Sequence, residues 1–367
     1  MLKILHVIGS LESGGSQTLF LNIFKSIDRS KIQFDFLISR PDELFYADIV
    51  RKLGGKIYVL PAFKGYNLLK YIKSWKEFFA KHPEYDIIHG HVRSTAAIYL
   101  KIAKKFKYIT ISHSHSVSSG KGIIAVIKNI LQYPIRYISD YFIACSDEAG
   151  KWLFGKRVCD SSRYIVLNNA IDYEEFLFNK DVRTTKRKEL DLGNKFVIGH
   201  VGRFISTKNH AFLIDIFKII HKMNKEALLL LVGDGELWQE IDKKVHDNEL
   251  SDCVVFTGAR SDVPQLLQAM DIFILPSLFE GLGIVLIEAQ ASGLVSVVSS
   301  GIPKEAYISD LVIPVSLKES PEYWANIILQ QNKFETRRNM SEVMKRSGFD
   351  IIETTKKIEE FYLMITK

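Results

Sequence analysis

Short apolar runs alternate along this chain with longer segments of helical periodicity, and this alternation restricts the possible folds more than any other feature. Amphipathic stretches such as Thr18–Ile27 and Leu68–Ala80 lie between most of the runs. Strands that are apolar throughout and separated by helices are typical of parallel sheets covered on both faces. The runs of the first half are Lys3–Ile8, Phe34–Ile38, Ile57–Leu60, Ile87–His89, Tyr108–Ser112, Tyr141–Ala144 and Tyr164–Leu167.

A second series of such runs begins after residue 192, so the sequence predicts two doubly wound α/β domains. A charged stretch without strand character, residues 178–192, separates the two series. We therefore predict domains over residues 1–178 and 179–344, followed by a last helix near Ser341–Thr366. The runs of the second half are Phe196–Val201, Ala227–Val232, Val254–Gly258, Ile272–Leu275, Val295–Ser299 and Leu311–Ile313.

The composition excludes several classes of protein and points to a basic first half. Apolar residues make up 47% and charged residues 25% of the 367, which excludes a disordered chain. Three cysteines are too few for a disulfide framework, and the absence of a signal peptide or an 18-residue apolar run predicts a cytoplasmic protein. Lysine and arginine outnumber acids by 25 to 16 over residues 1–178, but number 24 against 26 thereafter. Anionic lipid, nucleic acid or an acidic substrate would suit the basic half.

Glycines and cations follow two of the predicted strands, where doubly wound sheets bind their ligands. Gly14 and Gly15 lie between a strand and a helix, so they could cradle an anion or form a plain tight turn. Arg203 and Lys208 follow another strand and could together stabilise a phosphate leaving group. They could equally be two solvated surface cations.

The segment from Glu280 to Glu288 is the most informative. A glycine-rich turn opens an apolar helix here, and the backbone N–H groups of residues 282–284 could bind a diphosphate. If the segment were all helical, the two acids would lie about 12 Å apart, which suits the hydroxyl groups at the two ends of a nucleotide sugar.

Taken together, these motifs resemble the retaining glycosyltransferases of the GT-B fold, family four, which includes many capsule and exopolysaccharide enzymes. The resemblance spans nearly the whole chain. Besides the motifs above, it depends on Asn169-Ala170-Ile171-Asp172 with Phe176, Val232-Gly233-Asp234-Gly235, Phe256-Thr257-Gly258 and Pro276-Ser277. Ala170 stands where the family usually has glycine. The resemblance implies two Rossmann-like domains facing across a cleft and a last helix, about 345–367, that crosses back to the first domain.

The resemblance also implies the roles of individual residues. Arg203 and Lys208 match the cations that bind the donor diphosphate. Glu280 matches the acid that holds the donor hexose, and Glu288 the acid that binds the ribose. Residues matching the remaining donor contacts are Leu282, Gly283 and Ile284, near the phosphates, and Arg260, beside the nucleobase.

The resemblance assigns a histidine of the first domain to the transferred sugar. His113 matches it, although His115 is close enough to be the alternative, and His89 and His91 resemble an acceptor-side or structural pair. No Asp-x-Asp follows a strand, so we expect no metal site. The family likewise implies a reaction without metal or other cofactor.

Two basic amphipathic stretches, residues 66–81 and 121–136, could lie on an anionic membrane or pack their apolar stripes on the sheet. The packed arrangement is the commoner one for such helices.

We therefore expect a retaining, metal-independent transferase. It would move a hexose or N-acetylhexosamine from a nucleotide sugar, UDP-linked by expectation, to a lipid-linked glycan at the inner face of the membrane. A nucleotide-sugar epimerase of the same architecture is the alternative enzyme. A nucleic-acid-binding or membrane-binding protein is the non-enzymatic alternative, although no nucleic-acid-binding motif supports the first of these.

Overall fold

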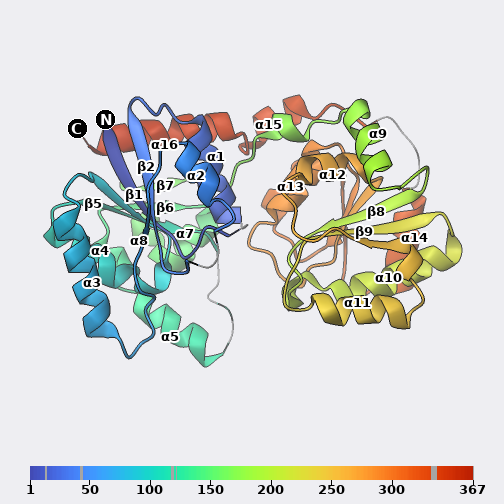
Figure 1. Cartoon of the computed structure of the whole chain (residues 1–367), viewed down its shortest axis with the longest axis horizontal. Helices are drawn as coiled ribbons and strands as arrows, with labels where there is room; N and C mark the ends of the chain where they lie inside the picture. The colour runs from blue at the N-terminus through green and yellow to red at the C-terminus, as the bar shows by residue number, and fades with distance from the viewer. Residues whose placement is uncertain (13–14, 42–43, 117–119, 121, 332–336, 367) are drawn as a thin grey trace. The chain divides into compact units, whose positions relative to one another are not determined.

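In a computed structural model the chain divides into two compact units, and each contains one parallel sheet (Figure 1). The structure describes residues 1–12, 15–41, 44–116, 120, 122–331 and 337–366. The first unit comprises Met1–Ile171 with Gly348–Lys367, and the second comprises Asp172–Ser347. The division after Ile171 therefore falls a few residues before the predicted boundary at 178.

The first unit has a seven-stranded sheet in the order β3-β2-β1-β4-β5-β6-β7, with neighbouring strands parallel. Its strands are β1 (Leu2–Val7), β2 (Ile32–Ile38), β3 (Ile57–Val59), β4 (Ile87–Gly90), β5 (Ile109–Ser114), β6 (Tyr141–Ala144) and β7 (Tyr164–Val166). Its helices are α1 (Gly15–Ser26), α2 (Ala47–Lys52), α3 (Leu68–Lys81), α4 (Arg93–Lys105), α5 (Ile123–Gln132), α6 (Ile135–Ile138), α7 (Asp147–Phe154), α8 (Lys156–Cys159) and α16 (Ile351–Ile365).

Helices bury both faces of this sheet, as its continuously apolar strands predict. Successive side chains of a strand point to opposite faces. Ile4 accordingly packs in one core with residues of α1 and α16, whereas Leu5 packs in the other with residues of α3 and α4.

The C-terminal helix α16 belongs to the first unit and packs beside α1. Its approach is fixed by two backbone hydrogen bonds: Ile171 N donates to Phe349 O at 2.9 Å, and Ile351 N donates to Ile171 O at 3.0 Å. The prediction of one continuous last helix was wrong. Gly348 has a φ of 77° and Asp350 caps α16, so α15 (Ser341–Ser347) and α16 are separate helices.

The second unit has a six-stranded sheet in the order β10-β9-β8-β11-β12-β13, again with parallel neighbours. Its strands are β8 (Phe196–Val201), β9 (Ala227–Val232), β10 (Val254–Phe256), β11 (Ile272–Leu275), β12 (Ser296–Ser299) and β13 (Val312–Val315). Its α-helices, besides α15, are α9 (Lys180–Glu189), α10 (His210–Met223), α11 (Trp238–Asp247), α12 (Val263–Ala269), α13 (Ile284–Ala291) and α14 (Pro321–Gln330). Short 3-10 helices are η1 (Tyr173–Phe176), η2 (Ser206–Lys208), η3 (Ser251–Cys253) and η4 (Lys304–Ala306).

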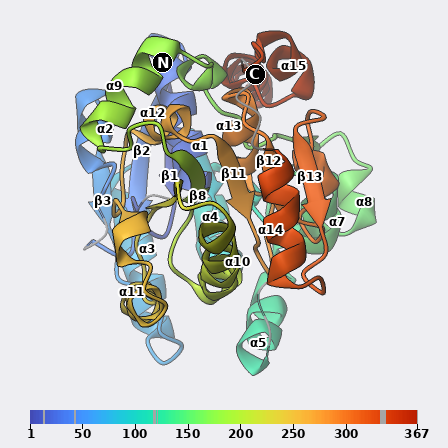
Figure 2. The same cartoon turned by 90° about the vertical axis from the view of Figure 1, so that its right-hand side faces the viewer.

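Each sheet reverses its strand order once, and the reversal places its ligand crevice. In the first unit the reversal lies between β1 and β4. In the second unit it lies between β8 and β11, and Figure 2 shows these two strands side by side. The loops that follow these four strands are therefore where the fold favours a bound ligand.

The two basic amphipathic stretches behave differently. In α3 the large side chains Trp75 and Phe79 are buried against the sheet, as the packed arrangement predicts. From α5 to α6, seven large apolar side chains are instead between 50% and 73% exposed: Ile123, Ile124, Val126, Ile127, Ile130, Tyr133 and Tyr137. The expectation that the second stretch packs its apolar side chains on the sheet is therefore wrong for most of them. No helix among the described residues is both long and apolar enough to cross a bilayer.

The burial of α16 predicts how much the first unit depends on it. Ile358 is fully buried in the core that α16 shares with α1, so Ile358→Ala should lower the free energy of unfolding by about 2–5 kcal/mol. Ile352, on the same helix, is 61% exposed, and Ile352→Ala should change it by at most about 0.5 kcal/mol. Urea unfolding followed by circular dichroism measures both. Equal effects from the two variants would show that α16 does not pack in this way.

Candidate functional site

The loops after β8, β9 and β10 are joined by backbone hydrogen bonds at one edge of the second sheet. Gly202 N donates to Val232 O, Phe204 N to Asp234 O and Gly233 N to Gly258 O, each at 2.9 Å. Gly233 has a φ of 140°, and a Cβ there would lie 2.0 Å from Gly202 O. Only glycine permits this close approach, which explains why glycines gather after these strands.

An ion pair joins the loop after β8 to the loop after β11. Lys208 Nζ lies 2.7 Å from Glu280 Oε1, and Ser277 Oγ donates to the same oxygen at 2.6 Å. Leu278 N donates to Thr207 O at 2.8 Å, which ties the two loops together through the backbone. Lys208 and Glu280, predicted from separate motifs, are therefore direct neighbours.

Glu288 lies in α13, on the other side of the glycine turn. The segment from Glu280 to Glu288 is not helical throughout, as the 12 Å estimate assumed, because α13 begins only at Ile284, after Gly283 with a φ of 81°. Burial raises the pKa of Glu288 to about 7, and the positive charge of Lys208 opposes this rise. The ammonium group of Lys208 thus acts on both carboxyl groups. It lies at hydrogen-bond distance from Glu280, and its electrostatic field favours the ionised form of Glu288.

The remaining predicted phosphate contacts lie on the same loops. Arg203 is exposed in the loop after β8. Leu282 and Gly283 directly precede α13, and Ile284 is its first residue. The first N–H groups of a helix have no intrahelical partner and face a favourable site for an anion. This end of the second sheet can therefore offer a guanidinium, an ammonium and backbone donors to a diphosphate.

Arg260 is placed differently from these residues, because its side chain is engaged by acids. Its Nε and Nη2 donate to Asp262 Oδ1 and Oδ2, both at 2.7 Å, and Nη2 also lies 3.3 Å from Glu189 Oε1. Hydrogen bonding to Asp262 raises the pKa of Arg260, and the pKa of Asp262 falls correspondingly. Arg260 therefore braces the loop after β10, and its predicted place beside the nucleobase stays a prediction.

In the first unit, Gly14 lies outside the described residues and Gly15 begins α1. His113, at the end of β5, is fully buried and stacks on His115 with 4.1 Å between ring centroids. Its Nδ1 lies 3.2 Å from His89 Nε2. The predicted contact of His113 with the transferred sugar stays a prediction, and of these three imidazoles only His115 is partly exposed.

Sequence reasoning missed residues that hold the predicted ones in place. Ser277 orients Glu280, and Asp262 orients Arg260. Both lie within three positions of the residue they hold, so a search for short-range hydrogen-bond partners could have found them. His6 was also missed, because a single histidine inside an apolar strand carries no motif of its own.

Comparisons with known proteins match both halves of the chain to glycosyltransferases. The model of Glycosyltransferase Family 4 matches residues 13–175, and that of Glycosyl transferases group 1 matches residues 182–346. EpsF of Bacillus subtilis is 31% identical over 95% of this chain and 93% of its own. An Escherichia coli UDP-Gal:alpha-D-GlcNAc-diphosphoundecaprenol alpha-1,3-galactosyltransferase is 24% identical over 99% of this chain and 97% of its own. The crystal structure of HepE from Anabaena in complex with UDP matches this chain with a TM-score of 0.78. The match covers 99% of this chain and 100% of HepE at 19% sequence identity, and it supports the predicted GT-B fold.

The raised pKa of Glu288 predicts a specific pH dependence of stability. Because the folded state binds this proton more tightly than the unfolded state, the contribution of Glu288 to stability is greatest below pH 4.5 and is lost as the pH rises through 7. Glu288→Gln keeps the neutral form at every pH. Relative to this variant, the wild-type chain should lose roughly 2–3 kcal/mol of unfolding free energy between pH 5 and pH 8. Urea unfolding at a series of pH values measures the difference, and a difference that does not change with pH would contradict the burial of this carboxyl group.

Proposed function

We propose that this chain, which belongs to family 4 of the glycosyltransferases, transfers a hexosyl or N-acetylhexosaminyl group from a UDP-sugar to a lipid-linked glycan of a surface polysaccharide. The observation that supports this most strongly is the placement of Lys208 beside Glu280 and Glu288 at the ligand edge of the second sheet. The E. coli relative uses a UDP-sugar and a diphosphoundecaprenol acceptor by its name, and HepE binds UDP. The epimerase alternative gains no support from the family models or from these relatives.

The donor would bind with its diphosphate over the loop after β8 and the start of α13. Lys208 would then exchange part of its contact with Glu280 for the phosphate oxygens, while Arg203 approaches from the adjacent loop. Glu280, released from Lys208 but still held by Ser277, would accept hydrogen bonds from the hexose hydroxyls. Glu288 would accept hydrogen bonds from the ribose, and the nearby Lys208 favours its ionised form.

The transfer would proceed with retention of the anomeric configuration. The bond between the anomeric carbon and the leaving phosphate oxygen breaks as the acceptor oxygen forms its bond on the same face. The acceptor proton passes to the leaving diphosphate, so that atoms and charge balance without a dedicated protein base. Arg203 and Lys208 stabilise the charge that builds up on the diphosphate.

No metal ion takes part in this proposed step, because the two cations supply the charge that Mg²⁺ would otherwise provide. His113 would orient the transferred sugar, as the family resemblance implies.

Removing the central cation tests the donor site. Lys208→Ala should lower kcat/KM for transfer by at least about a hundredfold, because the charge on the leaving diphosphate is no longer stabilised. Glu280→Ala should lose activity to a similar degree. Lys218→Ala removes an exposed lysine from the neighbouring helix α10 and is the matched control, which should retain wild-type activity.

The assay should follow transfer from UDP-sugars to a lipid-linked acceptor in a buffer without Mg²⁺ or Mn²⁺. Circular dichroism should confirm that each variant is folded. Wild-type kcat/KM in Lys208→Ala would disprove the proposed role, and a dependence on added Mg²⁺ would disprove the metal-independent step.

We further propose that α5 docks the first unit on an anionic membrane, where a lipid-linked acceptor would lie. Its exposed isoleucines could enter the interfacial region, while Lys128 meets anionic headgroups. Tyr133 adds an aromatic ring on which the Arg136 guanidinium stacks, 4.1 Å from the ring centroid. An apolar strip of this size exposed on a basic domain suits a membrane surface better than water.

Acidic substitutions on α5 test this docking. Ile127→Glu/Ile130→Glu should abolish co-sedimentation with vesicles of phosphatidylglycerol and phosphatidylcholine, because both positions are exposed and the new charges repel the surface. Leu69→Glu changes a leucine on α3 that is more exposed than either isoleucine, and it should leave binding unchanged. Equal binding by the α5 double variant and the wild-type chain would exclude α5 as the docking element.

A further inference from the structure

Five histidines gather at the ligand edge of the first sheet, on its neighbouring strands β1, β4 and β5. His6 on β1 is the direct parallel partner of His89 on β4, and His91 follows His89 by two positions. Two-residue spacing places side chains on the same face of a strand. His113 and His115 repeat that spacing at the end of β5, so the imidazoles form one stacked group.

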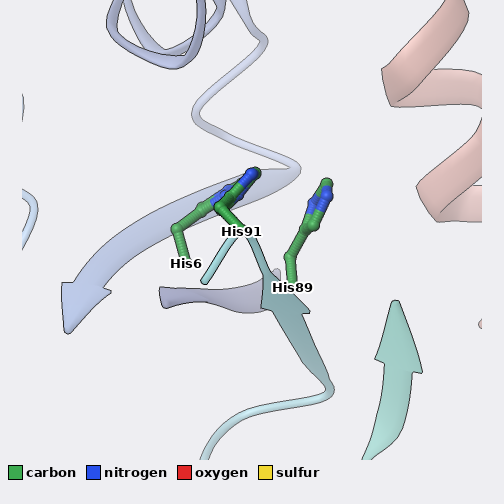
Figure 3. Close-up of side chains that lie close together, drawn as sticks. All are labelled: His6, His89 and His91. Carbon is green, nitrogen blue, oxygen red and sulfur yellow. The ribbon is translucent and has the colours of Figure 1, made fainter. Parts of the chain in front are cut away.

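His6, His89 and His91 lie as closely as the ligands of a metal ion. One ring nitrogen from each lies within 4.8 Å of the others, and His6 Nδ1 is 3.0 Å from His91 Nε2. Figure 3 shows the three side chains projecting to the same side of their strands. Tetrahedral zinc with bonds of about 2.0–2.1 Å would set its nitrogen ligands about 3.3 Å apart, so the His6–His91 pair is close to that spacing and any wider pair would have to close around the ion.

Two of the three histidines have the outer contact that a ligand histidine usually has. His89 Nδ1 lies 2.7 Å from Tyr362 Oη, and His91 Nδ1 lies 2.8 Å from His115 Nε2. These contacts leave His89 Nε2, His91 Nε2 and His6 Nδ1 to face an ion. His89 Nε2 lies 3.2 Å from His113 Nδ1, so ion binding would replace that contact.

The type of ligand limits which cation this cluster would bind. Among the described residues, the clusters with metal-ligand spacing contain only histidines. An all-imidazole set suits zinc, copper or nickel and does not suit Mg²⁺ or Ca²⁺, which prefer oxygen.

We propose that His6, His89 and His91 bind one divalent transition-metal ion of the zinc class, which ties the ends of β1 and β4 together in the first unit. His91, His113 and His115 form a second, overlapping set with the required spacing. The charge of Arg93 acts on His115, which makes that set the less favourable one for a cation. The proposed ion is structural and separate from the donor diphosphate, so it does not replace Arg203 or Lys208. It differs from the expectation of no metal site, which rested on the absence of an Asp-x-Asp motif and on the family resemblance.

The test is equilibrium dialysis of the untagged chain, first stripped with a chelator, against Zn²⁺ at neutral pH. The wild-type chain should retain about one equivalent, and its Tm should rise as Zn²⁺ is added. His6→Phe removes a ligand but suits the surrounding Phe20, Phe34 and Phe36. This variant and His91→Gln should each bind Zn²⁺ at least about tenfold more weakly. His246→Gln removes an exposed histidine of the second unit and should bind like the wild-type chain.

Two outcomes would overturn the proposal. Failure of the wild-type chain to retain Zn²⁺ decides against it without any variant, even if His6→Phe does not fold. Loss of binding in His115→Gln together with unchanged binding in His6→Phe would move the ion to the overlapping set and refute the assigned ligands. Circular dichroism of each variant should verify its fold before the affinities are compared.

Discussion

Parallel pairing of the strands is the constraint on which the rest of this structure depends. It brings the loops after the strands of one sheet to a common edge, and the reversal of strand order opens a crevice at that edge. Lys208 and Glu280 are 72 residues apart in sequence, yet they form an ion pair because β8 and β11 are neighbours in the sheet. His6 and His89 become partners in the same way, through the pairing of β1 with β4.

The same constraint explains what the sequence could and could not predict. Strand positions were predictable to within a few residues because a strand buried on both faces must be apolar throughout, as in Ala227–Val232. The predicted donor residues Lys208, Glu280 and Glu288 were placed by short motifs that follow such strands. The side-chain partners were not predictable in this way. Arg260 looks like a free cation in sequence, but Asp262 and Glu189 engage it, and only the fold brings Glu189 within reach.

Element boundaries and exposure were less predictable, for a related physical reason. A periodic apolar stripe does not reveal whether anything covers it, so α3 and α5 look alike in sequence although only α3 buries its large side chains. The charged stretch after residue 178 has no apolar stripe, yet it forms α9. Its Arg183 and Arg187 hold Asp271 and backbone carbonyl groups, and those polar contacts replace the burial that usually stabilises a helix. Hydrophobic periodicity does not detect a helix of this kind.

The two ligand edges differ in their electrostatic character, and this difference indicates a division of labour between the units. The edge of the second sheet holds Lys208, Glu280 and Glu288, where the proposed diphosphate would replace one set of charge contacts with another. The edge of the first sheet holds buried imidazoles that are kept neutral by their low pKa values. Uncharged imidazoles neither attract a diphosphate nor repel a neutral hydroxyl group. Under the proposed function, charge would therefore direct the anionic donor to the second unit. The first unit would then be left to neutral sugar hydroxyls and to the proposed metal ion, which imidazoles bind without help from carboxylates.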